Sequence, residues 1–471
     1  MTFATATPAQ RMKVRDEATK TAKMAQPWAQ NGVTPTAAED TALTTQLTAL
    51  AAAVQAVGVS PVPGIKIRAR DIYVTGDSRT ANGFSTVASP PQVVLESYGY
   101  GSMLGPETGG KVRVTHTRNG GVGGDTSTMW LARMPGIVAV GADVYVNLIS
   151  INDRGTAAMP LAQTQANILA GLKLQADTGA AVIVVAELPV TFLTGTQLTI
   201  HLAVRDWIKA YLPTLGYLVA DPWVDMVDPT SATYQPLAGM LVDDRHPAPA
   251  GAIIISRHIA RLIEGLYPTP LAMPNGVSNL WAAGNPTGWL TPNPDQTGTT
   301  GTLSASANAT GSLAANSFLT GSSWTGATVV AAKAPSPYGG EYQLLTFGGT
   351  PTAANPFLTY HQLVDLSQVA VGDVLRGLAR LDYTALAGIA GVSLELQITK
   401  PSGVEYYKIA DRYTAAFPVT QDRVRGVYET PQYVVDKTET EIRVRVTVYT
   451  QSNVALGGTL KIAGMTEQKI I

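Results

Sequence analysis

Short apolar runs alternate with amphipathic stretches between residues 66 and 268. The runs that predict strands are Asp71–Thr75, Val112–His116, Val144–Ile149, Val182–Ala186 and Tyr217–Ala220. The stretches that predict helices are 126–139, 160–176, 197–212 and 248–265. Nearly continuous apolar strands separated by helices are typical of a parallel sheet that is covered on both faces. We therefore expect an α/β domain over 66–268, with its ligand beyond the carboxyl ends of the strands.

From about residue 274 the sequence becomes turn-rich, and strands with strict alternation of apolar and polar positions follow. In "VSLELQIT" the residues Val392, Leu394, Leu396 and Ile398 share one face, and "EIRVRVTV" repeats the pattern. This alternation predicts antiparallel sheets with one apolar face each, which are buried together in a jelly-roll-like β-sandwich over 274–471. Large aromatic residues in this region either bind sugar rings or fill the core. Among them are Trp281, Trp289, Trp324, Tyr338, Tyr342, Tyr360 and Tyr383.

Residues 1–62 are rich in Ala, Thr and Gln and predict a helical N-terminal segment. Its second helix begins with a capping box, Thr36-x-x-Glu39. The following large apolar residues have heptad spacing, and they are Leu43, Leu47, Leu50, Val54 and Val57. Two interpretations remain open: a short coiled coil, or a helix that packs on its own domain. Pro61 and Pro63 then indicate a linker.

The composition of the chain argues against several classes of protein. The chain has 471 residues, enough for two or three domains, and 45% of them are hydrophobic. A net charge of −1 argues against a nucleic-acid-binding protein, which normally carries a basic stripe. The absence of cysteine excludes disulfides and thiolate chemistry. The first twenty residues lack the apolar region of a signal peptide, and no run of 18 apolar residues predicts membrane insertion.

A serine follows the first predicted strand in Gly76-Asp77-Ser78. A serine nucleophile needs a base, a group that orients the base, and donors for the oxyanion. His246 stands three residues after Asp243 in "LVDDRHPAPAG", and in a turn this spacing lets the carboxylate bind one imidazole nitrogen while the other faces the serine. Alone, Asp-x-x-His is a weak signal, and a turn at a helix start that exposes a histidine on the surface explains it better.

Candidate oxyanion donors follow the second and third predicted strands. "NGGVGGDTS" contains Gly123 and Gly124, which would let the backbone approach a substrate oxygen closely. Its other interpretations are a phosphate-binding loop and a plain flexible turn, but it lacks the glycine and lysine pattern of a nucleotide loop. "SINDRG" places Asn152 after the third strand, although Asn-Asp also suits an ordinary turn.

The ordered set Gly76-Asp77-Ser78, Gly124, Asn152 and Asp243-x-x-His246 resembles the SGNH (GDSL-type) hydrolase family, over about 200 of the 471 residues. The resemblance implies a flavodoxin-like three-layer domain with Ser78 as nucleophile, His246 as general acid and base, and Asp243 orienting His246. It implies an oxyanion hole formed by Ser78 N–H, Gly124 N–H and the Asn152 amide, and it implies no cofactor or metal. Ser150 departs from the family, which usually has glycine two residues before the asparagine.

Other hydrolase classes fit less well. The chain has no Gly-x-Ser-x-Gly for an α/β-hydrolase and no His-x-x-x-His for a zinc deacetylase. A carboxylate-pair glycosidase leaves no local motif and stays open.

We expect a serine esterase that removes O-acetyl groups from a polysaccharide, with 274–471 dispensable for small esters. The architecture is similar to that of phage tail-fibre or tailspike proteins, which implies a virion-tail location, other tail proteins as partners and a homo-oligomer, most plausibly a trimer. The alternatives are a virion protein whose SGNH domain only binds glycan, and a free bacterial carbohydrate esterase or lipase-like hydrolase, extracellular or cytoplasmic.

Overall fold

The computed structural model describes residues 70–155, 157–267, 280–282, 285, 288–411 and 426–470. The chain divides into two compact units, Met1–Ile67 and Arg68–Ile471. The helical segment predicted for 1–62, with its heptad spacing, lies outside the described residues.

A parallel sheet forms the centre of the α/β part. Its strands are β1 (Arg70–Gly76), β4 (Val112–Arg113), β5 (Asn119–Gly121), β6 (Val144–Leu148), β7 (Ala181–Val185) and β8 (Leu218–Ala220). Their order is β4-β1-β6-β7-β8, and β5 pairs with β1 further along the same edge. All pairs are parallel, and the order is that of flavodoxin-like folds. The predicted fold class is confirmed.

The second predicted strand is shorter than expected. Instead of one strand over Val112–His116, β4 ends at Arg113, a 3₁₀ turn spans His116–Arg118, and β5 resumes the pairing with β1. In the turn, the ring of His116 stacks on Phe84 at 5.6 Å. This interruption brings "NGG" of β5 against the end of β1.

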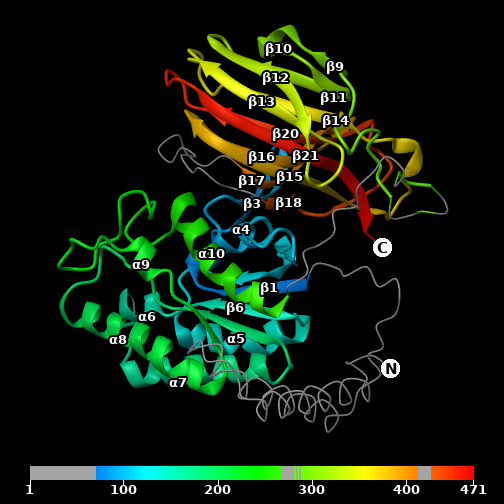
Figure 1. The fold of residues 1–471 in the computed structure, drawn as a ribbon. Coiled ribbons are helices and arrows are strands. Elements are labelled where there is room, and N and C mark those ends of the chain that lie inside the picture. The colour runs from blue at the N-terminus through cyan, green and yellow to red at the C-terminus, as the bar shows by residue number, and fades with distance from the viewer. Residues whose placement is uncertain are drawn as a thin grey trace, which may run out of the picture. The chain divides into compact units, whose positions relative to one another are not determined.

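Helices cover both faces of this sheet (Figure 1). The helices α4 (Tyr100–Glu107) and α10 (Pro249–Leu266) pack with one set of strand residues, which includes Ile72 and Val74. The opposite face carries Tyr73 and the helices α5 (Ser127–Val140), α7 (Leu161–Ala176) and α8 (Gly195–Tyr211). Successive residues of β1 thus point to opposite faces, as the continuous apolar run requires.

Two larger sheets form the C-terminal part. The seven-stranded sheet has the order β10-β12-β13-β21-β15-β18, with β19 paired to β15. The eight-stranded sheet begins with β2 (Phe84–Ala88) and β3 (Pro91–Glu96), and its order is β2-β3-β17-β16-β20-β14-β11-β9. Most pairs are antiparallel, and strand residues from both sheets share one apolar core. The strands are β9 (Thr300–Leu303), β10 (Ala309–Gly311), β11 (Leu313–Ser322), β12 (Ala327–Pro335), β13 (Glu341–Gly349), β14 (Phe357–Leu363), β15 (Val374–Ala387), β16 (Ile389–Lys400), β17 (Gly403–Asp411), β18 (Gly426–Glu429), β19 (Tyr433–Val434), β20 (Glu441–Thr450) and β21 (Gly457–Ile470).

The inward faces of this core follow the predicted alternation, and most of the aromatic residues of this part are buried as well. Val392, Leu394, Leu396 and Ile398 are all buried. Five of the seven aromatic residues considered as sugar platforms are at most 9% exposed, and they are Trp289, Trp324, Tyr342, Tyr360 and Tyr383. The core interpretation therefore holds for these five.

A hairpin from the α/β part completes the eight-stranded sheet. The strands β2 (Phe84–Ala88) and β3 (Pro91–Glu96) lie between the Ser78 turn and α4, and β3 pairs in parallel with β17. The side chains of Leu95 and Met103 are buried in the core of the β-rich part. The two parts of the chain consequently share a sheet and a core, which no sequence pattern indicated.

Candidate active site

The Gly-Asp-Ser turn is built by close backbone packing at the end of β1. A Cβ atom at Gly76 would lie 2.0 Å from the carbonyl oxygen of Leu148 in β6, so only glycine fits. Asp77 then caps the short helix α3 (Ser78–Ala81), its carboxylate accepting a hydrogen bond from the N–H of Arg79. Ser78 is the first residue of that helix, and it is displayed at the carboxyl edge of the sheet.

Three side chains form a continuous hydrogen-bonded chain beyond this edge. The Oγ of Ser78 lies 2.8 Å from Nε2 of His246, and Nδ1 of His246 lies 2.6 Å from Oδ2 of Asp243. The geometry assigns the proton of the neutral imidazole to Nδ1, which leaves Nε2 to accept from the serine. The structure thus brings together the three residues that the sequence nominated as nucleophile, base and orienting group.

Asp243 is fixed by its own turn as well as by His246. Its Oδ1 accepts hydrogen bonds from the backbone N–H groups of Arg245 at 2.9 Å and His246 at 2.8 Å. Partial burial alone would raise the pKa of Asp243, but the hydrogen bonds from His246 and the backbone outweigh it and hold the pKa below its usual value. The carboxylate is therefore ionised and able to stabilise an imidazolium.

The nominated oxyanion residues follow strands that flank β1. Gly76 of β1 is paired with Gly121 of β5 on one side and with Leu148 of β6 on the other. The side-chain amide of Asn152, in α6 (Ile151–Gly155), donates to the carbonyl oxygen of Asp125 at 3.0 Å. The loop that carries Gly124 is also tied to β1, because the N–H of Val122 donates to the carbonyl of Gly76 at 3.1 Å.

The glycines of this loop meet two different structural requirements. A Cβ atom at Gly124 would meet nothing within 4 Å, but its φ of +82° favours glycine. The close backbone contacts occur earlier, at Gly121, where a Cβ atom would lie 2.3 Å from the backbone nitrogen of Ala81. Gly121 thus fixes the loop against α3, and Gly124 provides the left-handed turn.

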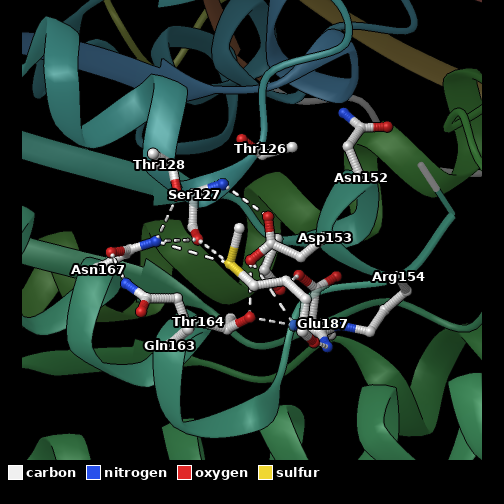
Figure 2. Close-up of polar contacts among 12 residues, drawn as sticks. Thr126, Ser127, Thr128, Asn152, Asp153, Arg154, Gln163, Thr164, Asn167 and Glu187 are labelled. Atoms are coloured by element: carbon white, nitrogen blue, oxygen red, sulfur yellow. Dashed lines mark hydrogen bonds and ion pairs between the residues drawn. The ribbon is translucent and has the colours of Figure 1, made fainter. Parts of the chain in front are cut away.

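Asp153 holds the Gly124 loop from the other end, a role that the sequence did not reveal. Its buried carboxylate accepts from the N–H of Ser127, the first residue of α5, at 2.7 Å and from Thr164 Oγ1 at 2.8 Å. Figure 2 shows these contacts, with Asn152 directed away from them. An anion at a helix N-terminus is favourable. Asn152 and Asp153 therefore attach the same loop at two points, and their adjacency in "SINDRG" was the available signal.

Three other histidines lie outside this candidate site and contact other residues. His201 is buried and its Nε2 contacts the carbonyl of Leu188, whereas His258 contacts Asp225 and His361 stacks on Phe318. Across the described residues, no group of three or more His, Cys, Asp or Glu side chains is arranged to hold a metal ion. Within the same residues, no helix combines the length and apolar character needed to span a membrane.

Comparisons with solved structures give matches of low sequence identity. The chain is similar to a GDSL-like lipase from Bacteroides thetaiotaomicron, with 18% identity and a TM-score of 0.34, covering 46% of this chain and 97% of that one. It is also similar to a lipolytic G-D-S-L family protein from Veillonella parvula, with 14% identity and a TM-score of 0.32, covering 41% of this chain and 97% of that one. A third match is a variant of an acetyl-xylooligosaccharide esterase from Geobacillus Stearmophilus, with 19% identity and a TM-score of 0.33, covering 42% of this chain and 96% of that one. No curated protein matches the chain.

A protein family, by contrast, matches the region that contains the site. Residues 74–253 match the GDSL-like Lipase/Acylhydrolase family, and this span includes Ser78, Gly124, Asn152, Asp243 and His246. The family match, the flavodoxin-like sheet and the hydrogen-bonded serine, histidine and aspartate agree with one another. Residues 74–253 are therefore a domain that matches an acylhydrolase family in sequence and holds the serine, histidine and aspartate in one hydrogen-bonded chain.

Proposed function

We propose that this protein is a serine esterase that removes O-acetyl groups from a polysaccharide. The observation that carries the proposal is the chain of hydrogen bonds from Ser78 Oγ through His246 to Asp243. In the first step Ser78 Oγ attacks the ester carbonyl while His246 Nε2 accepts the hydroxyl proton, and the ionised Asp243 stabilises the imidazolium that forms.

The tetrahedral intermediate carries a negative charge on the former carbonyl oxygen. We assign its stabilisation to the N–H groups of Ser78 and Gly124 and to the amide of Asn152. His246 then returns its proton to the departing sugar oxygen, which leaves an acetyl group on Ser78. A water molecule, deprotonated by His246, attacks this acyl-enzyme and releases acetate with the serine restored.

The accessibility of the site supports a polymeric substrate with a short acyl group. The side chains of His246 and Asp243 are 20% and 48% exposed, so an ester on a large chain can reach them. Only the acetyl group then has to enter the site, and contacts to neighbouring sugars supply the remaining binding energy. Arg245, which is next to His246 in the chain, binds Asp244 and stacks on the aromatic ring of Phe192 at 3.9 Å.

The experiment that tests this function measures acetate release from acetylated polysaccharides, together with hydrolysis of p-nitrophenyl esters of two to twelve carbons. We expect acetate release by the wild type, none by Ser78→Ala, and falling kcat/KM beyond four carbons. A preference for eight or more carbons would replace the carbohydrate esterase with a lipase or thioesterase. Ser78→Ala should still bind the polymer, which separates catalysis from binding alone.

We further propose that the esterase acts on a virion tail, as a homotrimer. The support is the heptad spacing within 36–58 and the β-rich part that follows the hydrolase domain. Light scattering on the full chain and on a chain that begins at residue 66 is the test. A trimer that becomes a monomer on removal of 1–65 agrees with the proposal, whereas two monomers contradict it.

A further inference from the structure

A buried polar network lies directly behind the Ser78 turn. The guanidinium of Arg79 binds both carboxylate oxygens of Asp77, through Nε at 3.0 Å and Nη2 at 2.7 Å. Its Nη1 donates to Glu187 Oε2 at 2.6 Å, and the hydroxyl of Ser150 donates to Glu187 Oε1 at 2.5 Å. The four side chains are fully buried, so solvent does not screen these contacts.

The network joins the ends of three neighbouring strands. Arg79 follows β1, Ser150 follows β6, and Glu187 follows β7, and these strands are adjacent in the sheet. The first of these ends carries the nucleophile Ser78, and the second carries Asn152, two residues after Ser150. Glu187 binds Arg79, which is adjacent to Ser78, and Ser150, which lies two residues before Asn152.

Two of the three residues depart from the family pattern. The name of the family places leucine after Gly-Asp-Ser, where this chain has Arg79. Ser150 stands where the family usually has glycine, and its φ of +116° is a conformation that favours glycine. The hydrogen bond to Glu187 offsets this backbone strain. Burial alone would raise the pKa of Glu187, but Arg79 and then His201 hold it below its usual value.

We propose that Arg79, Glu187 and Ser150 are positioning residues that act as one unit, fixing Ser78 against the oxyanion donor Asn152. Arg79 sets the Ser78 turn through Asp77, and Ser150 sets the start of α6. Glu187 couples the two. None of the three touches the substrate, so the unit changes the rate of acyl transfer and leaves substrate binding unchanged. The inference rests on the proposed acyl transfer at Ser78.

The test is a double-mutant cycle between Ser150→Gly and Glu187→Met, measured as kcat and KM on p-nitrophenyl acetate. Glycine relaxes the backbone at 150 and removes the hydroxymethyl side chain, and methionine keeps the length of Glu187 without the carboxylate. We expect Ser150→Gly to lower kcat about tenfold with KM within twofold. In the Glu187→Met background the same change should alter kcat less than twofold, because the partner of the hydroxyl is absent.

Two further variants keep the test decisive. Glu187→Gln preserves the shape of the side chain and one acceptor, so it should retain more activity than Glu187→Met. It replaces Glu187→Met in the cycle if that variant does not fold. Thr291→Val is the matched control, because it removes an equally buried hydroxyl that donates to Thr466 at 2.9 Å in the β-rich part. It should lower the melting temperature and leave kcat unchanged.

Labelling of Ser78 by a fluorophosphonate probe distinguishes failure of the proposed function from failure of the positioning unit. A wild type that neither hydrolyses the ester nor reacts with the probe refutes the proposed function. A reactive wild type whose Ser150→Gly variant keeps full kcat, or loses the same factor in both backgrounds, refutes the positioning unit alone. A loss of kcat in Thr291→Val equal to that in Ser150→Gly would also refute it, since the effect would then reflect general destabilisation.

Discussion

The imidazole of His246 lies 2.8 Å from the hydroxyl of Ser78, although 168 positions separate the two residues in the sequence. The contact forms because Ser78 lies at the carboxyl edge of the sheet and the loop that carries His246 reaches it there. Ser78 begins α3 after β1, and His246 lies in the loop that leads into α10.

Replacing either partner in this contact should remove nearly all esterase activity. We expect Ser78→Ala and His246→Ala to lower kcat on p-nitrophenyl acetate by at least about 10⁴-fold. Asp243→Asn should cost less, because it disturbs the orientation and charge stabilisation of the base and keeps the base itself. Circular dichroism is the control for folding, and wild-type turnover in Ser78→Ala would end this assignment.

The oxyanion donors can be tested independently of the nucleophile. Asn152→Ala should lower kcat by roughly 10²–10³-fold with little change in KM, since the amide acts on charge that develops in the transition state. Gly124→Ala should also lower kcat, but through the backbone: φ is +82° and no neighbouring atom obstructs a methyl group. Gly123→Ala, at an equally open site, is the matched control. Equal losses at both glycines would indicate a general loop effect.

Truncation before residue 274 should abolish activity on small esters as well as on polymer. This expectation reverses the one drawn from the sequence, because β3 pairs with β17 and Leu95 is buried in the core of the β-rich part. Without residues 274–471, the hairpin loses its partner strand and exposes apolar surface. Solubility and p-nitrophenyl acetate hydrolysis of a chain ending at 268 are the measurements. A soluble product with wild-type kcat would show that the α/β part folds alone.

Glu467 predicts a pH dependence of stability. Its carboxyl is fully buried, and neither oxygen has a hydrogen-bond partner. It pairs with Gly377, whose Cβ position faces Leu396 and Val444, so its side chain faces the apolar core. Burial raises the pKa of Glu467 well above its usual value.

The sign of this dependence follows from proton binding. Between the pKa of the unfolded chain, about 4.3, and the raised pKa of the folded protein, the folded state binds more protons. As far as it depends on Glu467, the free energy of unfolding is therefore highest below about pH 4, and it falls as the pH rises. Glu467→Met should raise the free energy of unfolding by about 1–3 kcal/mol at low pH and by more at pH 8. Urea midpoints at pH 5 and 8 test this, and an equal gain at both values would contradict it.

The α/β fold was predictable because its strands are continuous apolar runs and its helices are long. The residues Ile72 to Val74 are buried on both faces of the sheet, and this leaves a clear pattern in sequence. The hydrogen-bonded residues Ser78, Asp243 and His246 were found because each belongs to a short motif in a fixed order. Local pattern and chain order were sufficient for these features.

The rest depended on contacts between distant residues. Nothing in "AELPV" marks Glu187 as a partner of Arg79, because the two lie 108 positions apart and meet only in the folded sheet. The hairpin β2–β3 was missed for two reasons: Pro90 and Pro91 interrupt its pattern, and its pairing strand lies far along the chain. The aromatic residues of the β-rich part offered a sugar-binding interpretation, but burial of large apolar area decided the position of most of them.

The pairing of β3 with β17 also bears on biosynthesis. The hairpin emerges from the ribosome soon after Ser78, but β17 spans Gly403–Asp411 and is synthesised only when most of the chain is complete. Until then the edge of β3 and the side chain of Leu95 lack their partners. Domains usually fold in order as they are translated, but this hydrolase domain cannot finish first. Hydrolytic activity should therefore arise late, which keeps an incomplete chain from acting as an esterase.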